Sequence, residues 1–74
     1  MILGERVKER RLALGLTQLD VGKALGHDYS QYAGDIERGK IRNLTIATLS
    51  KLAGVLKCTE SYLLGKERNT DEAA

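Results

Sequence analysis

Apolar residues near the start of the chain recur at the three- and four-residue spacing of an amphipathic helix. Leu3 and Val7 share one face, and the spacing predicts a first helix over residues 4–14. Arg10 or Arg11 falls on the same face, where an aliphatic side chain is expected. Because an unpaired buried charge is costly, an arginine on this face requires a carboxylate partner.

The following stretch predicts two short helices joined by a turn. Thr17 is placed to cap the first of them, with Gln18 at its first position, and Gly26 ends it in the left-handed conformation. Asp28 and Gln31 form a capping box, which predicts that the second helix begins at the residue between them, Tyr29. Two helices joined by a short turn containing glycine have the outline of a helix-turn-helix, whose second helix can lie in the major groove of DNA.

The second helix of this unit separates its apolar from its polar residues. Ala33 and Ile36 form the inner face, flanked by one of the tyrosines, and Gly39 ends the helix. Short hydrogen-bonding groups on the other face suit the reading of base edges, although an ordinary solvated surface has the same composition. The residues expected to face outward are Ser30, Gln31, Gly34 and Asp35.

Positive charge gathers where this helix ends. Arg38, Lys40 and Arg42 place three cations within five residues, and Asn43 follows them in the loop. Beside an outward-facing helix, such a cluster can clamp the phosphates on either side of a groove. Without that helix, the same residues would be read equally well as ordinary loop charges.

Two further helices complete the pattern. Thr45 is expected to cap a fourth helix over residues 46–56, and Thr59 a short fifth helix that Gly65 stops. The fifth helix is too short to be stable alone, so it must pack on the core or on a partner. The apolar face of the fourth helix comprises Ile46, Leu49, Leu52 or Ala53, and Leu56.

These elements predict an all-α fold with five helices. We expect one compact domain over residues 1–65 and a flexible C-terminal tail over residues 66–74. Seventy-four residues leave no room for a second core. The chain has no Pro, Trp or Phe, and its mostly aliphatic apolar residues suit a small helical core.

Composition also limits the chemistry. Cys58 is the single cysteine, so it cannot form an internal disulfide, and we expect it to be an inert core residue. His27, the only histidine, is expected to lie exposed in the turn. Because no nucleophile stands beside a base and no metal-ligand spacing is present, we expect no enzyme activity, no metal and no cofactor.

No apolar run approaches the length needed to cross a membrane, and no signal peptide is evident. We therefore expect a cytoplasmic protein with no membrane partner. The net charge of +2 is only mildly basic and does not by itself argue for nucleic acid. The argument for DNA depends on the motifs.

In combination, several segments resemble the lambda-repressor-like, Cro/XRE-type helix-turn-helix regulators of bacteria and their phages. The resemblance covers nearly the whole chain, residues 3–65, and implies a sequence-specific DNA-binding transcriptional regulator of repressor or controller type. The segments that carry it are ERVKERRLALGLTQ, KALG, DIERGK, TIATLSKLAGVL and TESYLLG.

The resemblance also implies roles for single residues. It pairs Arg11 with Glu37 at the end of the recognition helix, and it gives Gln18 a phosphate contact and the bracing of that helix. It implies a homodimer on double-stranded DNA, with half-sites about one helical turn apart. The dimer contact would use Tyr62 and Leu64 of helix five. The residues implied to read bases are Ser30, Gln31 and Asp35, with Tyr32 beside them near the DNA backbone.

Three features depart from the family's pattern. The segment between Gly26 and Ile36 is one residue longer, which leaves the register of the first turn of the recognition helix open. Leu44 stands where the family often has proline. The recognition helix is not basic, so Asp35 could accept a bond from a cytosine amino group, repel phosphates or be an ordinary surface acid.

The acidic recognition helix, Gly34 within it and the low net charge motivate a second hypothesis. The fold could serve as a protein-interaction module, such as an antitoxin or anti-repressor, for which DNA binding is secondary. A stable protein partner that co-purifies without DNA would favour this alternative.

Overall fold

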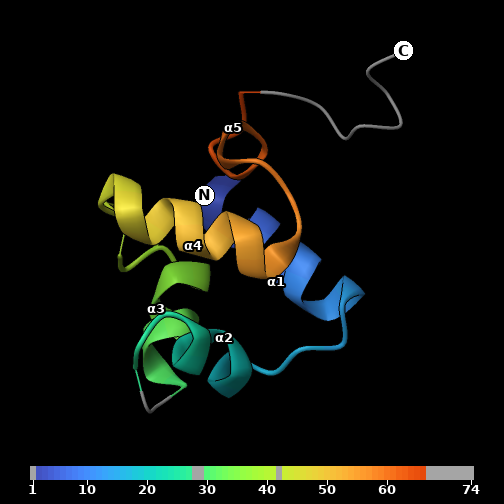
Figure 1. The fold of residues 1–74 in the computed structure, drawn as a ribbon, viewed down its shortest axis with the longest axis vertical. Coiled ribbons are helices and arrows are strands. Elements are labelled where there is room, and N and C mark those ends of the chain that lie inside the picture. Colours follow the sequence, from blue (N-terminus) through green and yellow to red (C-terminus); the bar gives the residue numbers. More distant parts are fainter. Residues whose placement is uncertain (1, 28–29, 42, 67–74) are drawn as a thin grey trace.

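The computed structural model describes residues 2–27, 30–41 and 43–66. These residues form five α-helices and no strand, which confirms the predicted all-α fold (Figure 1). Of the predicted tail over residues 66–74, only Lys66 belongs to the described part of the chain. The helices are α1 (Ile2–Ala13), α2 (Gln18–Ala24), α3 (Gln31–Glu37), α4 (Ile46–Leu56) and α5 (Glu60–Leu63).

Threonine caps begin α2, α4 and α5, as the sequence predicts. The hydroxyls of Thr17, Thr45 and Thr59 each accept a backbone N–H from the first turn of the helix that follows. At α2 the Asp20 carboxylate also accepts the Thr17 N–H at 2.9 Å, and this capping box lowers the pKa of the Asp20 carboxyl below its ordinary value. Since each cap stabilises its helix by about 1 kcal/mol, the local sequence fixes these starting points.

Glycines end the two helices of the central unit. Gly26 follows α2 with a φ of +93°, and Gly39 follows α3 with a φ of +82°. Residues with a side chain adopt such angles only at a cost, so a glycine is favoured at both places. Both ends lie where the sequence predicts them.

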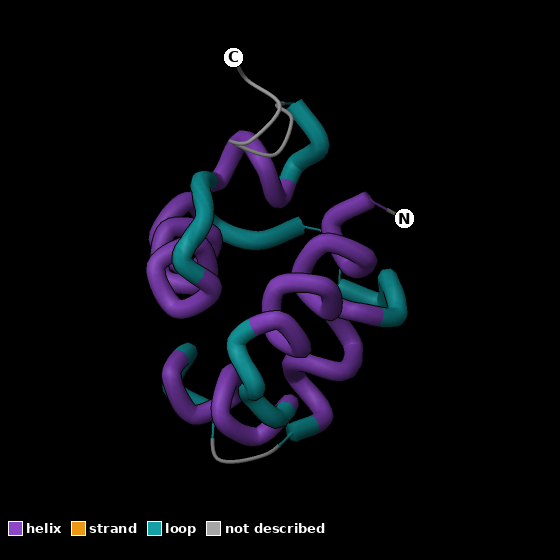
Figure 2. The backbone as a smooth tube through the Cα atoms, turned by 90° about the vertical axis from the view of Figure 1, so that its right-hand side faces the viewer, coloured by secondary structure: helices purple, strands orange, loops and turns teal. Residues whose placement is uncertain are grey.

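The two ends of the molecule contain different helices. α2 and α3 lie together at one end of the long axis, and α5 lies at the other end near the start of α1 (Figure 1). Figure 2, turned by a quarter revolution, shows the same separation. α1 contacts α3, α4 and α5, so this helix joins the two ends.

The core is aliphatic and draws on every helix. Its largest fully buried side chains come from α1, α2, α3, α4 and α5, and each such side chain stabilises the fold by about 2 kcal/mol. Cys58 packs half-buried against the edge of this core. The buried apolar residues are Leu3, Val7, Val21, Leu25, Ala33, Ile36, Leu52, Ala53, Leu56, Tyr62 and Leu63.

Two sequence predictions about helices α3 and α4 are wrong. α3 begins at Gln31, so the predicted start at Tyr29 is too early; Asp28 and Tyr29 themselves lie outside the described residues. Ser30 precedes α3 and makes no side-chain cap bond. Ile46 is 84% exposed, because it lies in the first turn of α4 at the edge of the apolar face.

Candidate nucleic-acid interface

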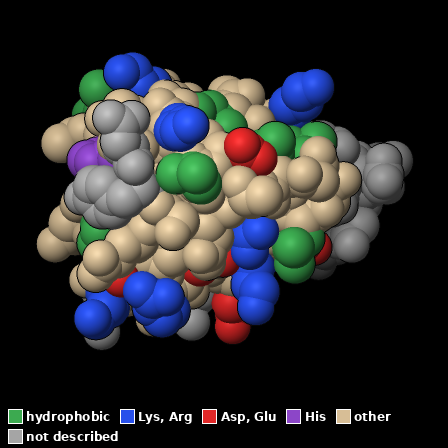
Figure 3. All heavy atoms as spheres, turned by 90° about the horizontal axis from the view of Figure 1, so that it is seen from below, with side chains coloured by type: hydrophobic (Ala, Val, Ile, Leu, Met, Phe, Trp, Pro, Cys, Tyr) green, Lys and Arg blue, Asp and Glu red, His purple; other side chains and the backbone are tan. Residues whose placement is uncertain are grey.

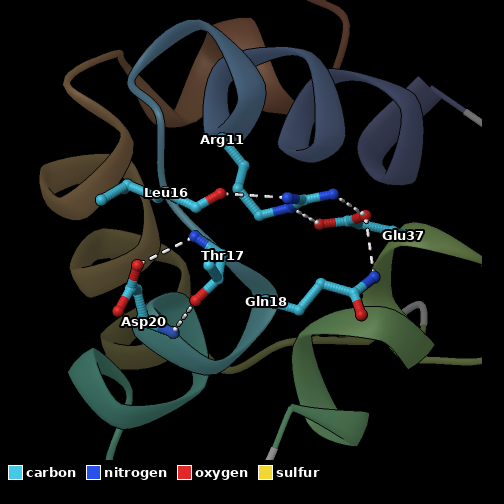
Figure 4. A network of polar contacts seen from close by, with 6 residues as sticks. All are labelled: Arg11, Leu16, Thr17, Gln18, Asp20 and Glu37. Carbon is cyan, nitrogen blue, oxygen red and sulfur yellow. Dashed lines mark hydrogen bonds and ion pairs between the residues drawn. The ribbon is translucent and has the colours of Figure 1, made fainter.

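A buried ion pair joins α1 to the end of α3. Arg11 Nε donates to Glu37 Oε2 at 2.6 Å and Arg11 Nη2 donates to Glu37 Oε1 at 3.2 Å, a two-pronged contact (Figure 4). The two side chains are 11% and 5% exposed. Arg11 is therefore the arginine of the inner stripe, and it finds the carboxylate that its position requires.

Glu37 is shared by three helices. Besides Arg11, it accepts a hydrogen bond from Gln18 Nε2 at 3.2 Å, so that the first residue of α2 is tied to the last residue of α3 (Figure 4). Arg11 Nη1 also donates to the carbonyl of Leu16, in the connection before α2, at 3.0 Å. This network fixes the direction of α3 relative to α1 and α2, which is the role a buried ion pair serves better than net stabilisation.

Gly4 brings the α1 backbone against the end of α3. A Cβ built on Gly4 would lie 2.7 Å from the carbonyl oxygen of Ile36 and would overlap the carbonyl oxygen of Glu37. Backbone atoms cannot move aside as a flexible side chain can, so only glycine fits here. This role of Gly4 was not predicted from the sequence, although a glycine one position from the buried Leu3 could have signalled a close helix contact.

The start of α3 faces solvent. Ser30 and Gln31 are exposed, as expected of residues that read bases, and Tyr32 is half-buried against the core. Tyr32 also stacks on His27, with ring centroids 4.0 Å apart and an interplanar angle of 20°. The expectation that His27 lies exposed in the turn is therefore wrong, because this stack partly covers its ring.

Gly34 is buried, which corrects its expected outward position. Side chains from two directions cover it: a Cβ at this position would lie 3.1 Å from Arg38 Nη1 and 3.4 Å from the amide group of Gln18. Arg38 in turn pairs with Asp35, one helical turn back, at an N–O distance of 2.5 Å. The acid of the outward face is thus engaged by a cation of its own helix.

The cations beyond α3 lie on an open surface. Arg38 and Lys40 are exposed, Asn43 is exposed in the following loop, and Arg42 lies outside the described residues. Leu44 stands where the family often has proline. It packs half-buried against the core at the end of this loop. Seen from the α2–α3 end, the Lys and Arg side chains of the described residues are spread over the face and do not form one basic patch (Figure 3).

The residues expected at a dimer contact differ in exposure. Tyr62 is 9% exposed: its hydroxyl donates to Glu9 Oε1 at 2.6 Å, and the Arg6 guanidinium lies 4.3 Å from its ring centroid. The hydrogen bond with Glu9, aided by burial, raises the pKa of the Tyr62 phenol. Leu64 is 44% exposed. Tyr62 is therefore engaged mainly within its own chain, and Leu64 presents the larger free surface.

The described residues also bear on two other kinds of site. They contain no group of three or more His, Cys, Asp and Glu side chains placed to hold a metal ion. Nor does any helix in this part of the chain have the length and apolar character needed to span a membrane.

Comparison with known proteins agrees with this geometry. A sequence model of the family described as helix-turn-helix matches residues 7–63, more than half of the chain. A crystal structure of SinR, the master regulator for biofilm formation, in complex with DNA is similar at a TM-score of 0.73 and 29% sequence identity. The similarity covers 84% of this chain and 97% of the SinR chain. No curated protein matches the sequence.

Proposed function

The chain belongs to the lambda-repressor-like, Cro/XRE-type helix-turn-helix family of DNA-binding regulators, and from this premise we propose that it regulates transcription by sequence-specific binding to double-stranded DNA. In this proposal it works in the cytoplasm as a repressor or controller, with α3 in the major groove. One observation carries the proposal. The exposed polar start of α3 is held at a fixed angle by the contacts of Glu37 with Arg11 and Gln18.

We assign base reading to the outward side chains of α3. Ser30 and Gln31 can each donate and accept hydrogen bonds, as discrimination between base pairs in the major groove requires. Asp35 lies one turn further along α3 and can accept from a cytosine amino group. Tyr32 lies beside these residues, and its ring stacks on that of His27.

Phosphate contacts are assigned to the residues on either side of α3. Gln18 uses one amide N–H for Glu37, and its second N–H can donate to a phosphate oxygen. Arg38 and Lys40 supply exposed positive charge at the other end. Arg42 and Asn43 extend this group along the loop by sequence position.

We further propose that the protein acts as a homodimer on a two-fold symmetric operator. α5 lies at the opposite end of the molecule from α2 and α3 (Figure 1). A contact through Leu64 of two copies would therefore leave both α3 helices uncovered, so that each is free to bind a half-site. Tyr62 would support this contact from inside its own chain.

One argument for the alternative, a protein-interaction module, is the acidic character of α3, and the contacts of its acids weaken that argument. The acids that make α3 look unsuited to DNA are Asp35 and Glu37, and both are engaged by arginines of the same chain. The charge that α3 presents to a partner is therefore less negative than its sequence indicates. We regard DNA as the primary partner.

The test begins with selection of bound sequences from a random DNA pool, which returns the half-site and its spacing. Fluorescence anisotropy then compares variants on the selected duplex. Gln31→Ala should weaken binding to it by about tenfold, because a base-edge contact is lost. Lys40→Ala should weaken binding to all sequences and lower the slope of log affinity against log salt by about one unit.

Lys66→Ala is the matched control for charge, because Lys66 lies beyond α5, at the end away from α3. It should change neither affinity nor slope by a comparable amount. If Gln31→Ala and Lys40→Ala both bind as the wild type does, the assignment of this surface is wrong. If no duplex is retained and a protein partner is, the alternative function replaces the proposed one.

A further inference from the structure

We propose that Asp35 and Arg38 form a charge clamp that makes DNA binding depend on sequence, with Asp35 as a specificity-determining residue that acts through Arg38. The inference rests on the proposed function, that α3 enters the major groove. In the free protein, Asp35 holds the Arg38 guanidinium. On the correct sequence, a base donor takes the place of Arg38, which then binds a phosphate.

The geometry of the pair supports such an exchange. The N–O distance is 2.5 Å, yet the Arg38 side chain is 57% exposed and the Asp35 side chain 18% exposed. Both groups can therefore reach an incoming ligand. The Arg11–Glu37 pair uses the other acid of α3 and joins it to α1, but its side chains are almost fully buried. It cannot exchange partners without opening the contact between α1 and α3.

The lack of a side chain at Gly34 leaves room for the Arg38 side chain. A side chain there would lie within 3.1 Å of Arg38 Nη1 and 3.4 Å of the Gln18 amide group. Because Gly34 has no side chain, Arg38 Nη1 and the Gln18 amide group both lie close to it, while Arg38 Nη2 pairs with Asp35. This position of Arg38 is next to the amide group to which we assign a phosphate contact, so Arg38 needs only a side-chain movement to join it.

The clamp acts differently on different sequences. While Arg38 is paired with Asp35, the carboxylate offsets the charge that Arg38 offers a phosphate. On random DNA, Arg38 offers its full charge only if it leaves Asp35, and the released carboxylate then faces a negatively charged groove with no donor opposite it. On the correct sequence, an amino group such as that of cytosine donates to Asp35 and removes this cost. The Asp35–Arg38 pair therefore weakens binding to random DNA more than binding to the correct sequence. This difference raises the ratio of specific to nonspecific affinity.

The test is a double-mutant cycle with wild type, Asp35→Asn, Arg38→Gln and the double variant. Each is titrated with a short random-sequence duplex and with the selected duplex over a range of salt. Asp35→Asn should raise affinity for random DNA by roughly fivefold near 0.1 M salt and steepen the salt slope by about one unit, because Arg38 is released. On the selected duplex its affinity should stay the same or fall.

The decisive comparison is made in the Arg38→Gln background. If Asp35 acts through Arg38, Asp35→Asn should have little effect on random-DNA binding there. A gain as large as in the wild-type background would mean that Asp35 merely repels phosphates, and the clamp would be wrong. Glu60→Gln in α5 makes the same charge change at the far end and should not reproduce the gain.

Failure of the clamp and failure of the proposed function give different results. If wild type binds both duplexes equally while the cycle behaves as expected, sequence-specific function fails but the coupling of Asp35 to Arg38 stands. If wild type prefers the selected duplex and Asp35→Asn leaves random-DNA affinity unchanged, only the clamp fails. Absence of binding by all four proteins overturns both.

Discussion

Helix α1 is attached to the two ends of the molecule by arginines that are used in two different ways. Towards α3, Arg11 meets the carboxylate of Glu37 in a buried pair, close to where Gly4 lies against backbone carbonyls. On its other side, Arg10 donates to the carbonyl of Leu56, the last residue of α4, at 3.1 Å, and Arg6 donates to the carbonyl of Tyr62 in α5 at 3.0 Å. These second contacts use neutral carbonyl acceptors in place of a carboxylate.

The two kinds of contact differ in how much stability is lost when one partner is removed. A carbonyl at a helix end can be satisfied by water when an arginine is lost, so the contacts with α4 and α5 can be broken at modest cost. A buried carboxylate or guanidinium without its partner cannot, and neither can a backbone carbonyl move away from an added side chain. The end that holds α3 at its angle is therefore rigid and sensitive to change, whereas the α5 end is adaptable.

The largest effect is expected from Glu37→Ala. It leaves Arg11 buried without a carboxylate and Gln18 without an acceptor, and should lower the free energy of unfolding by about 3 kcal/mol or more. Urea or thermal unfolding measures this loss. Arg10→Ala, the matched change at the contact of α1 with the end of α4, should cost about 1 kcal/mol.

A double replacement sharpens this prediction. Arg11→Met with Glu37→Leu removes both charges together and should recover much of the stability lost in Glu37→Ala. Equal melting of Glu37→Ala and wild type would show that Arg11 is solvated and that the contrast between the two ends does not hold.

Gly4→Ala should have the next largest effect. The new methyl group would overlap the carbonyl oxygens of Ile36 and Glu37, so α1 must shift, and we expect a loss of about 2 kcal/mol in unfolding experiments. Gly54→Ala in α4 is the control, because no atom within 4 Å meets its Cβ. That variant should gain up to about 1 kcal/mol from helix propensity. Similar behaviour of the two variants would contradict the close contact at Gly4.

Tyr62→Phe tests the α5 end of the molecule and should have the smallest effect. It removes the hydrogen bond to Glu9 and should cost about 1 kcal/mol near neutral pH. Because the folded state raises the pKa of the phenol, the stabilisation is present below the ordinary phenol pKa of about 10 and is lost as pH rises through the higher folded value.

The measurement for Tyr62 is unfolding of both proteins as pH is raised. The advantage of wild type over Tyr62→Phe should shrink at alkaline pH. A constant difference across the whole range would mean that the Tyr62 phenol has the same pKa in the folded and unfolded states.

Much of the fold follows from local sequence signals. The threonine caps at Thr17, Thr45 and Thr59 begin helices where predicted, because a cap is satisfied by its own next turn. α3 was harder. Its predicted start at Tyr29 relied on a local capping box, whereas the observed first helical residue is Gln31, after a Ser30 that makes no side-chain cap bond.

The sequence by itself determined the helical pattern, the aliphatic core and the need of an arginine in α1 for a carboxylate, since these depend on spacing and on the cost of burying charge. Only the tertiary structure decided that Gly4 must be glycine and that Gly34 is covered. The physical reason is the same in each case. Whether a position is open or filled depends on side chains and carbonyls that come from other turns and other helices, and no single stretch of sequence contains them.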